Sequence, residues 1–140
     1  MNFKFILIFF TFFFQINFAH AKLINNWNAY VNAYYDGHDY CFDKWMQVGD
    51  FDANPKVLLD IEKCTYRQDV KALKKYAGNS VSQRMFDLIH KKHIELLELA
   101  GDATLDAVNY DRRAAINRFL IYRDQILEDY FYILRSIASK

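Results

Sequence analysis

The sequence contains very little proline and glycine. One Pro and four Gly in 140 residues supply too few turns for a sandwich or barrel of many short strands, which favours an all-α fold. The chain also lacks an excess of basic residues, because 18 Lys and Arg stand against 17 Asp and Glu. Proteins that bind nucleic acid normally show such an excess, so we expect no nucleic-acid partner.

The hydrophobic residues are unevenly distributed. Residues 1–21 hold eight of the 13 Phe, with an apolar run from Phe5 to Phe14 after Lys4 and the sequence Ala19-His20-Ala21 at the end. This order is typical of a secretory signal peptide and predicts cleavage before Lys22. The apolar run is shorter than the roughly 20 residues that span a bilayer, which makes an uncleaved membrane anchor the less favoured alternative.

These features predict a signal peptide, residues 1–21, and a single helical domain, residues 22–140. The mature protein is expected to be exported, either periplasmic or secreted, with no stable membrane anchor after cleavage.

Apolar residues of the domain recur at spacings of three and four, which predicts helices. The first is expected over residues 23–48, and the second after Asn54-Pro55, ending near Ala77. The expected inward seam of the first helix is Ile24, Trp27, Val31, Tyr34, His38, Cys41, Trp45 and Val48.

Two further helices are expected in the second half of the domain. Ser80 and Gln83 fit a capping box for a helix that runs to about Leu99, with residues 103–108 either prolonging it or forming a short turn, and Asp111 can cap a long final helix. The expected inward stripe of the final helix is Phe119, Tyr122, Ile126, Tyr130, Ile133 and Ile137. Because the connections are short, neighbouring helices should be antiparallel, giving an up-down-up-down four-helix bundle.

The domain has two cysteines, Cys41 and Cys64. Two cysteines in an exported domain usually form a disulfide. Cys41 lies eight residues before Gly49 and Cys64 lies nine residues after Pro55, so an antiparallel hairpin brings both to nearly the same height. We therefore predict a bridge that staples the first hairpin; two unrelated buried thiols are the alternative.

The segment His38-Asp39-x-Cys41 resembles the active-site helix of secreted phospholipases A2, in which the His activates water and the Asp holds calcium. The resemblance implies His38 and Asp39 as catalytic candidates. It covers four residues only: the Gly-rich calcium loop of that family is missing before Asp36, and Cys64 is followed by Thr65 rather than Asp. The alternative is a His38 that fills the seam and finds one hydrogen-bond partner.

Two patterns bear on metal binding, and neither predicts a site. Asp50-x-Asp52-x-Asn54 copies the first ligand positions of a calcium loop, but Pro55 replaces the required Gly. His90 and His93 share a helical face with Asp87, but di-metal bundles need Glu-x-x-His on two helices. We expect no metal and no cofactor.

Charge is uneven along the chain although its sum is small. In the predicted topology, Asp50, Asp52, Asp102, Asp106 and Asp111 gather at one end of the bundle. Lys71, Lys74 and Lys75 lie toward the other end. Such a bipolar molecule could steer a charged partner.

The first helix and its loop are rich in aromatic residues, which fits either a binding surface or a broad core with amphipathic rims. The expected surface comprises Tyr30, Tyr35, Tyr40, Asp50, Phe51 and Asp52. The leading hypothesis is a small exported protein that binds another protein, of the inhibitor, immunity or effector type. The alternatives are a carrier of an apolar small ligand in the bundle interior and, less favoured, a His-dependent hydrolase.

Overall fold

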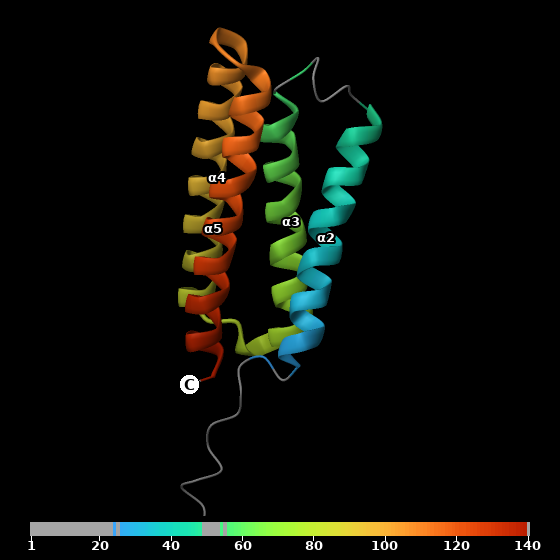
Figure 1. The fold of residues 1–140 in the computed structure, drawn as a ribbon. Helices are drawn as coiled ribbons and strands as arrows, with labels where there is room; N and C mark the ends of the chain where they lie inside the picture. The colour runs from blue at the N-terminus through green and yellow to red at the C-terminus, as the bar shows by residue number, and fades with distance from the viewer. Residues whose placement is uncertain (1–23, 25, 49–53, 55, 140) are drawn as a thin grey trace, which may run out of the picture.

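The computed structural model describes residues 24, 26–48, 54 and 56–139. Within them the chain forms four long α-helices: α2 (Trp27–Val48), α3 (Val57–Ala77), α4 (Gln83–Asn109) and α5 (Arg112–Ala138), with a short 3-10 helix, η1 (Gly78–Ser80), between α3 and α4. Consecutive helices are antiparallel and pack side by side as a bundle (Figure 1). The predicted all-α up-down-up-down bundle is confirmed.

The helix ends follow capping chemistry. Asp111 caps α5 as predicted, because its Oδ1 accepts a hydrogen bond from the Ala114 amide at 3.0 Å. The predicted cap of α4 was wrong by two residues: Ser80 belongs to η1, and the Ser82 Oγ accepts from the Met85 amide at 3.3 Å. Gly78 follows α3 with a positive φ of 52°, a conformation that favours glycine.

Two boundaries differ from the sequence prediction. The first helix begins at Trp27 rather than at residue 23. At this start, the Asn26 Oδ1 accepts a hydrogen bond from the Ala29 amide. The third helix continues past Leu99 and Gly101 to Asn109. A single Gly costs a helix only about 1 kcal/mol, which the packing of Ala100, Ala103 and Ala107 offsets.

The apolar interior consists of two clusters. The larger lies toward η1 and is built from large side chains: Ile24, Tyr30, Tyr34, Leu73, Met85, Ile89, Leu96, Leu127, Tyr130, Leu134 and Ile137, with Ala72, Ala77 and Ala138. The smaller lies toward the α4–α5 turn and contains Leu58, Ala100, Ala103 and Phe119. We call these the η1-end cluster and the turn-end cluster.

The inward stripe of α5 is shifted from its prediction. Tyr122 and Ile133 are exposed, whereas Arg123 and Leu134 are buried. The apolar pattern misled because a charged residue occupies an inward position, and its burial is possible only because Glu62 neutralises it.

Candidate functional site

A layer of charged side chains crosses the bundle between the two apolar clusters, and each helix contributes to it. The members are His38 from α2, Glu62 and Asp69 from α3, Lys92 from α4 and Arg123 from α5, and none is more than 5% exposed. We call this group the ionic layer. The carboxylates of Glu62 and Asp69 face the side chains of Lys92 and Arg123, so the formal charge of the layer is zero when both bases are protonated and His38 is neutral.

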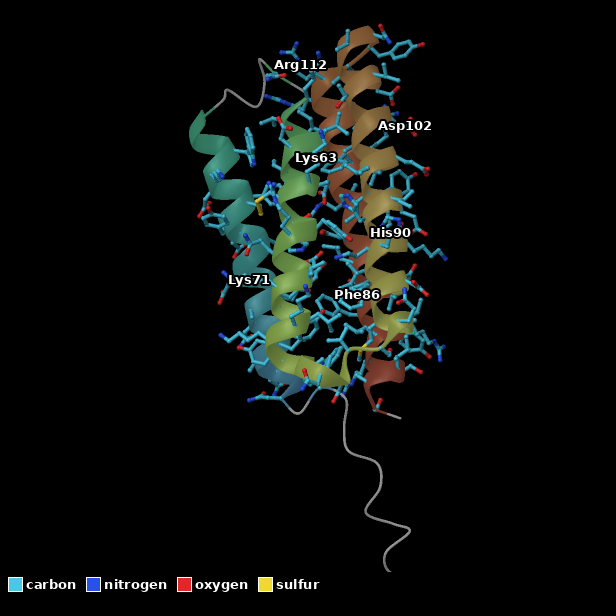
Figure 2. All side chains as sticks on the ribbon, turned by 180° about the vertical axis from the view of Figure 1, so that it is seen from behind. Lys63, Lys71, Phe86, His90, Asp102 and Arg112 are labelled. Carbon is cyan, nitrogen blue, oxygen red and sulfur yellow. A yellow bond between two sulfur atoms is a disulfide. The ribbon has the colours of Figure 1, made fainter. Side chains whose placement is uncertain are left out.

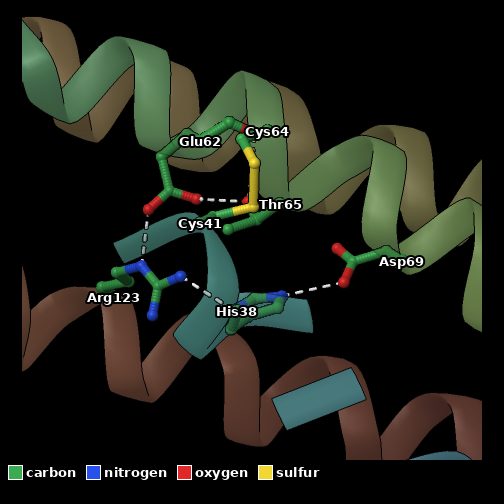
Figure 3. Close-up of a disulfide and its surroundings, with 7 residues drawn as sticks. All are labelled: His38, Cys41, Glu62, Cys64, Thr65, Asp69 and Arg123. Carbon is green, nitrogen blue, oxygen red and sulfur yellow. Dashed lines mark hydrogen bonds and ion pairs between the residues drawn. A yellow bond between two sulfur atoms is a disulfide. The ribbon is translucent and has the colours of Figure 1, made fainter. Parts of the chain in front are cut away.

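Arg123 connects α5 to both α3 and α2 (Figure 3). Its Nε donates to Glu62 Oε1 at 2.5 Å, and its Nη2 donates to His38 Nδ1 at 2.9 Å. The other Glu62 oxygen accepts from the Thr65 hydroxyl at 3.0 Å. Both Glu62 oxygens are therefore satisfied inside the protein, as a buried carboxylate requires.

The tautomer of His38 follows from this geometry. A guanidinium has only donors, so Nδ1 must accept from Arg123 with its lone pair. The ring proton then sits on Nε2, which donates to Asp69 Oδ1 at 2.8 Å. His38 is consequently neutral, and protonating Nδ1 would break the contact with Arg123.

Lys92 completes the layer on the side of the η1-end cluster. Its Nζ donates to Asp69 Oδ2 and, at 2.9 Å, to the Tyr34 hydroxyl. The same Nζ lies 4.3 Å from the ring centroid of Tyr130, where the negative face of the ring stabilises a cation. Tyr130 in turn shares a 2.8 Å hydrogen bond with the Tyr30 hydroxyl.

The pKa shifts of the layer agree with this picture. Burial lowers the pKa of His38, more than the contact with Asp69 raises it. Burial alone would raise the pKa of Asp69, but Lys92 and the His38 hydrogen bond reverse this and lower it. Burial also lowers the pKa of Lys92, against the attraction of Asp69. The charged forms of these side chains are thus stabilised by one another rather than by water.

The predicted disulfide is present next to the layer. Cys41 and Cys64 are joined with their Cα atoms 5.8 Å apart, which staples α2 to α3. Within the described part of the chain, no helix combines the length and hydrophobicity that a membrane span requires.

The catalytic reading of His38 and Asp39 finds no support in this geometry. His38 is 3% exposed and both of its ring nitrogens are engaged. Asp39, the neighbour in sequence, is exposed on the outer side of α2. A water-activating His needs a free ring nitrogen that can reach the substrate. Both nitrogens of His38 are hydrogen-bonded inside the bundle. The interpretation of His38 as a hydrogen-bonded interior side chain fits, with two partners rather than one.

The structure separates the residues of the expected tyrosine surface. Tyr30 was wrongly placed there, because it is fully buried and its ring packs against Trp27, Tyr34 and Phe131. Tyr35 and Tyr40 are exposed on α2. Asp50, Phe51 and Asp52 lie outside the described residues.

The paired histidines of α4 also have a structural setting. His93 stacks on Tyr66 of α3 with ring centroids 4.2 Å apart, and partial burial lowers its pKa. His90 is exposed on the same side (Figure 2). Among the described residues, no three His, Cys, Asp or Glu side chains gather as a metal site would need.

Sequence reasoning missed most of the ionic layer. A signal was present: Glu62 and Asp69 are seven residues apart on one face of α3, and Arg123 lies midway between Phe119 and Leu127. Charged residues at apolar positions of a helical repeat indicate buried pairs.

Comparisons with known proteins give no family for this chain. No family model, curated protein or solved structure matches it. Its function must therefore be argued from its own residues.

Proposed function

We propose that the chain is a small exported helical protein that acts by binding another protein. The disulfide and the signal-like residues 1–21 support export. The ionic layer and the packed tyrosines support a structural interior, because their polar atoms already have partners inside the bundle. Binding is then a property of the outer surface.

The observation that carries the proposal is an inversion of apolar side chains in the last three turns of α4. The inward positions are the small residues Ala100, Ala103 and Ala107, whereas Leu105 and Val108 point outward at 62% and 67% exposure. Tyr110, which follows α4, is 83% exposed. Large apolar side chains are thus placed where they contribute nothing to the interior.

This surface has the chemistry of a docking site. We define the turn-end surface as Leu105, Val108 and Tyr110. Leu105 also lines an open cleft with Leu59 of α3 and Gly101 of α4, and exposed apolar residues beside a concave feature mark sites of protein contact. Tyr is favoured there because its ring gives a large contact area at low entropy cost.

A triple variant tests the turn-end surface. Leu105→Ser, Val108→Ser and Tyr110→Ser together should reduce capture of the partner from the exported fraction of the host at least about tenfold, since central apolar residues dominate interfaces. The melting temperature should change little, because exposed positions affect folding by less than about 0.5 kcal/mol each.

The matched control replaces exposed tyrosines elsewhere, Tyr35→Ser with Tyr40→Ser. Loss in the tyrosine variant alone would relocate the site to α2, where the sequence placed it, and equal loss in both variants would mean that the partner contacts both surfaces. Equal capture by the wild type, the triple variant and the tyrosine variant would show that neither surface binds the partner. A further arm reverses Asp50 and Asp52, which tests the contribution of the acidic loop to binding.

A further inference from the structure

The exposed side of α3 carries one kind of charge. Each α3 residue that is exposed is basic: Lys63, Arg67, Lys71, Lys74 and Lys75. They follow one another at spacings of four, four, three and one along the helix (Lys63 and Lys71 are labelled in Figure 2). None of them forms an ion pair with a described residue, since the pairs present there involve other cations. We call this row the basic column.

The neighbouring helix α2 carries mostly the opposite charge on its exposed side, where Lys44 is the one exposed base among its described side chains. Asp36, Asp39 and Asp43 of α2 are exposed at spacings of three and four. They likewise form no ion pair with a described residue. We call them the acidic column. The outer face of the first hairpin thus presents two adjacent, parallel columns of unlike charge.

The register of the hairpin places the two columns at the same height. Cys41 is bonded to Cys64, and a Cβ on Gly37 would lie 2.7 Å from the Gln68 Cβ, so the residue numbers at one level add up to 105. Asp43 is then level with residue 62, Asp39 with 66 and Asp36 with 69. At 1.5 Å per residue, each acid lies within about 3 Å in height of Lys63, Arg67 or Lys71, respectively.

The acidic column and the part of the basic column at its level, Lys63, Arg67 and Lys71, have opposite charge and are complementary to their own copy. A two-fold axis parallel to the helices, running along the groove between α2 and α3, leaves heights unchanged and exchanges the two helices. The acidic column of one copy then faces the basic column of the other, and the reverse pairing occurs at the same time. This is the condition for an isologous interface, in which one patch meets itself.

The groove on that axis suits close approach. It is lined by the small residues Ala33, Gly37 and Ala72, with Tyr40 at its rim at 54% exposure. Small residues let two hairpins come close, and an exposed Tyr from each copy supplies an apolar contact between the charged columns.

We propose that the outer face of the α2–α3 hairpin binds a second copy of this chain in a symmetric, electrostatically registered dimer. A broad anionic partner such as a lipid surface fits less well, because it would meet Asp36, Asp39 and Asp43 with like charge. The basic column also lacks an exposed apolar side chain that could insert into a membrane. In the dimer, both turn-end surfaces stay available to the other protein.

Charge-swap variants test the dimer by sedimentation velocity of the purified exported protein at low salt. Changing the three acids to Lys (D36K, D39K, D43K) or the three bases to Glu (K63E, R67E, K71E) should weaken self-association more than about tenfold, because like charges then face each other. An equal mixture of the two variants should dimerise again, since every pairing is restored. The control (E98K, D102K, D124K) changes three exposed acids on α4 and α5 and should dimerise like the wild type.

Salt gives a second readout that does not depend on folding of the variants. Wild-type dimers should dissociate as ionic strength rises to about 0.5 M, because exposed pairs are screened. Three outcomes would overturn the proposal. The wild type could be monomeric at low salt, or its dimer could be unaffected by salt. The mixture of variants could also stay monomeric while both variants keep native circular dichroism. Recovery of a monomeric wild type on phosphatidylglycerol vesicles, lost in the Glu variant, would assign the basic column to lipid instead.

Discussion

The two ends of the bundle are held together in different ways. Toward η1, Tyr, Leu, Ile and Met side chains from all four helices form one packed cluster, and several rings stack edge to face. Toward the α4–α5 turn, the cluster contains Phe119, one Leu and two Ala. Helix α4 shows the gradient directly, since its buried residues change from Met85 and Ile89 to Ala103 and Ala107.

The difference indicates a division of labour along the molecule. Apolar burial contributes about 25 cal/mol per Å², so the turn-end cluster, with far fewer members, stabilises its end less than the η1-end cluster. At the turn end, the buried Nε1 of Trp45 also has no hydrogen-bond partner among the described residues. The disulfide and the ionic layer, which lie between the clusters, therefore matter most for the turn end, where the proposed binding surface is exposed.

The largest expected effect comes from breaking the ionic layer. Asp69→Ala removes the ion-pair partner of Lys92 and one partner of His38 together, leaving a buried cation without an adjacent carboxylate. We expect the free energy of unfolding to fall by about 3–5 kcal/mol, measured by urea denaturation. Asp39→Ala, at an exposed site of α2, is the matched control and should change stability by less than about 0.5 kcal/mol. A small effect of Asp69→Ala would mean that water enters the layer.

Removing the disulfide sharpens the comparison of the two ends. The double variant Cys41→Ala with Cys64→Ala opens a loop closed by residues 23 apart in sequence, which the loop-entropy account values at about 3 kcal/mol. Amide hydrogen exchange should rise mainly in the second half of α2 and the first half of α3. Amides near Leu73, Ile89 and Leu134 should keep their protection. Uniform loss of protection would show that the bundle unfolds as one unit with no weaker end.

The charge distribution at the turn end shows one limit of reading a linear sequence. Asp102, Asp106 and Asp111 do lie toward that end, as the topology predicted, but Arg112 and Arg113 begin α5 beside them. Asp106 is paired with Arg118 at 3.1 Å. The sequence prediction considered only the acidic residues of this end, and the arginines of α5 make the turn end mixed rather than acidic. Asp50 and Asp52 lie outside the described residues.

The fold was accessible from sequence because it rests on local signals. Helix periodicity, the cap at Asp111 and the nearly equal distances of Cys41 and Cys64 from the first connection all depend on residues close in the chain. The cap predicted at Asn54 was wrong in position, because α3 begins at Val57 after Lys56, which makes no side-chain capping hydrogen bond. The ionic layer depends instead on pairs of residues from different helices. Glu62 and Arg123 are 61 residues apart in sequence, and His38 and Arg123 are 85 residues apart. Periodicity predicts that a position faces inward, but it does not predict which charged residue of another helix lies next to it.

The same reason explains the error at Tyr30. Four tyrosines in one helix exceeded what a single apolar face accommodates, so some had to be exposed, yet the choice among them depended on α5. The Tyr30 hydroxyl forms a hydrogen bond with the Tyr130 hydroxyl inside the bundle, and the ring of Tyr30 packs against Phe131. The ring of Tyr35 also contacts Tyr34 and Phe131, but Tyr35 and Tyr40 both remain about half exposed.

The smallest expected effect is a pH dependence that originates in the layer. The unfolded chain protonates His38 near its ordinary pKa of about 6.5, whereas the folded protein, whose His38 pKa is lowered by burial, does so only at lower pH. The unfolded state therefore binds more protons in this window, and stability falls as pH decreases below about 6.5, by up to about 1.4 kcal/mol per unit. His38→Gln should flatten the slope measured by urea denaturation, because an amide can still donate to Asp69 and accept from Arg123 without titrating. His93→Gln is the control: the His93 pKa is also lowered, but this residue is only partly buried on Tyr66, so it should remove the smaller share of the slope. If the two variants flatten the profile equally, the tautomer imposed by Arg123 does not govern the acid sensitivity of the turn end.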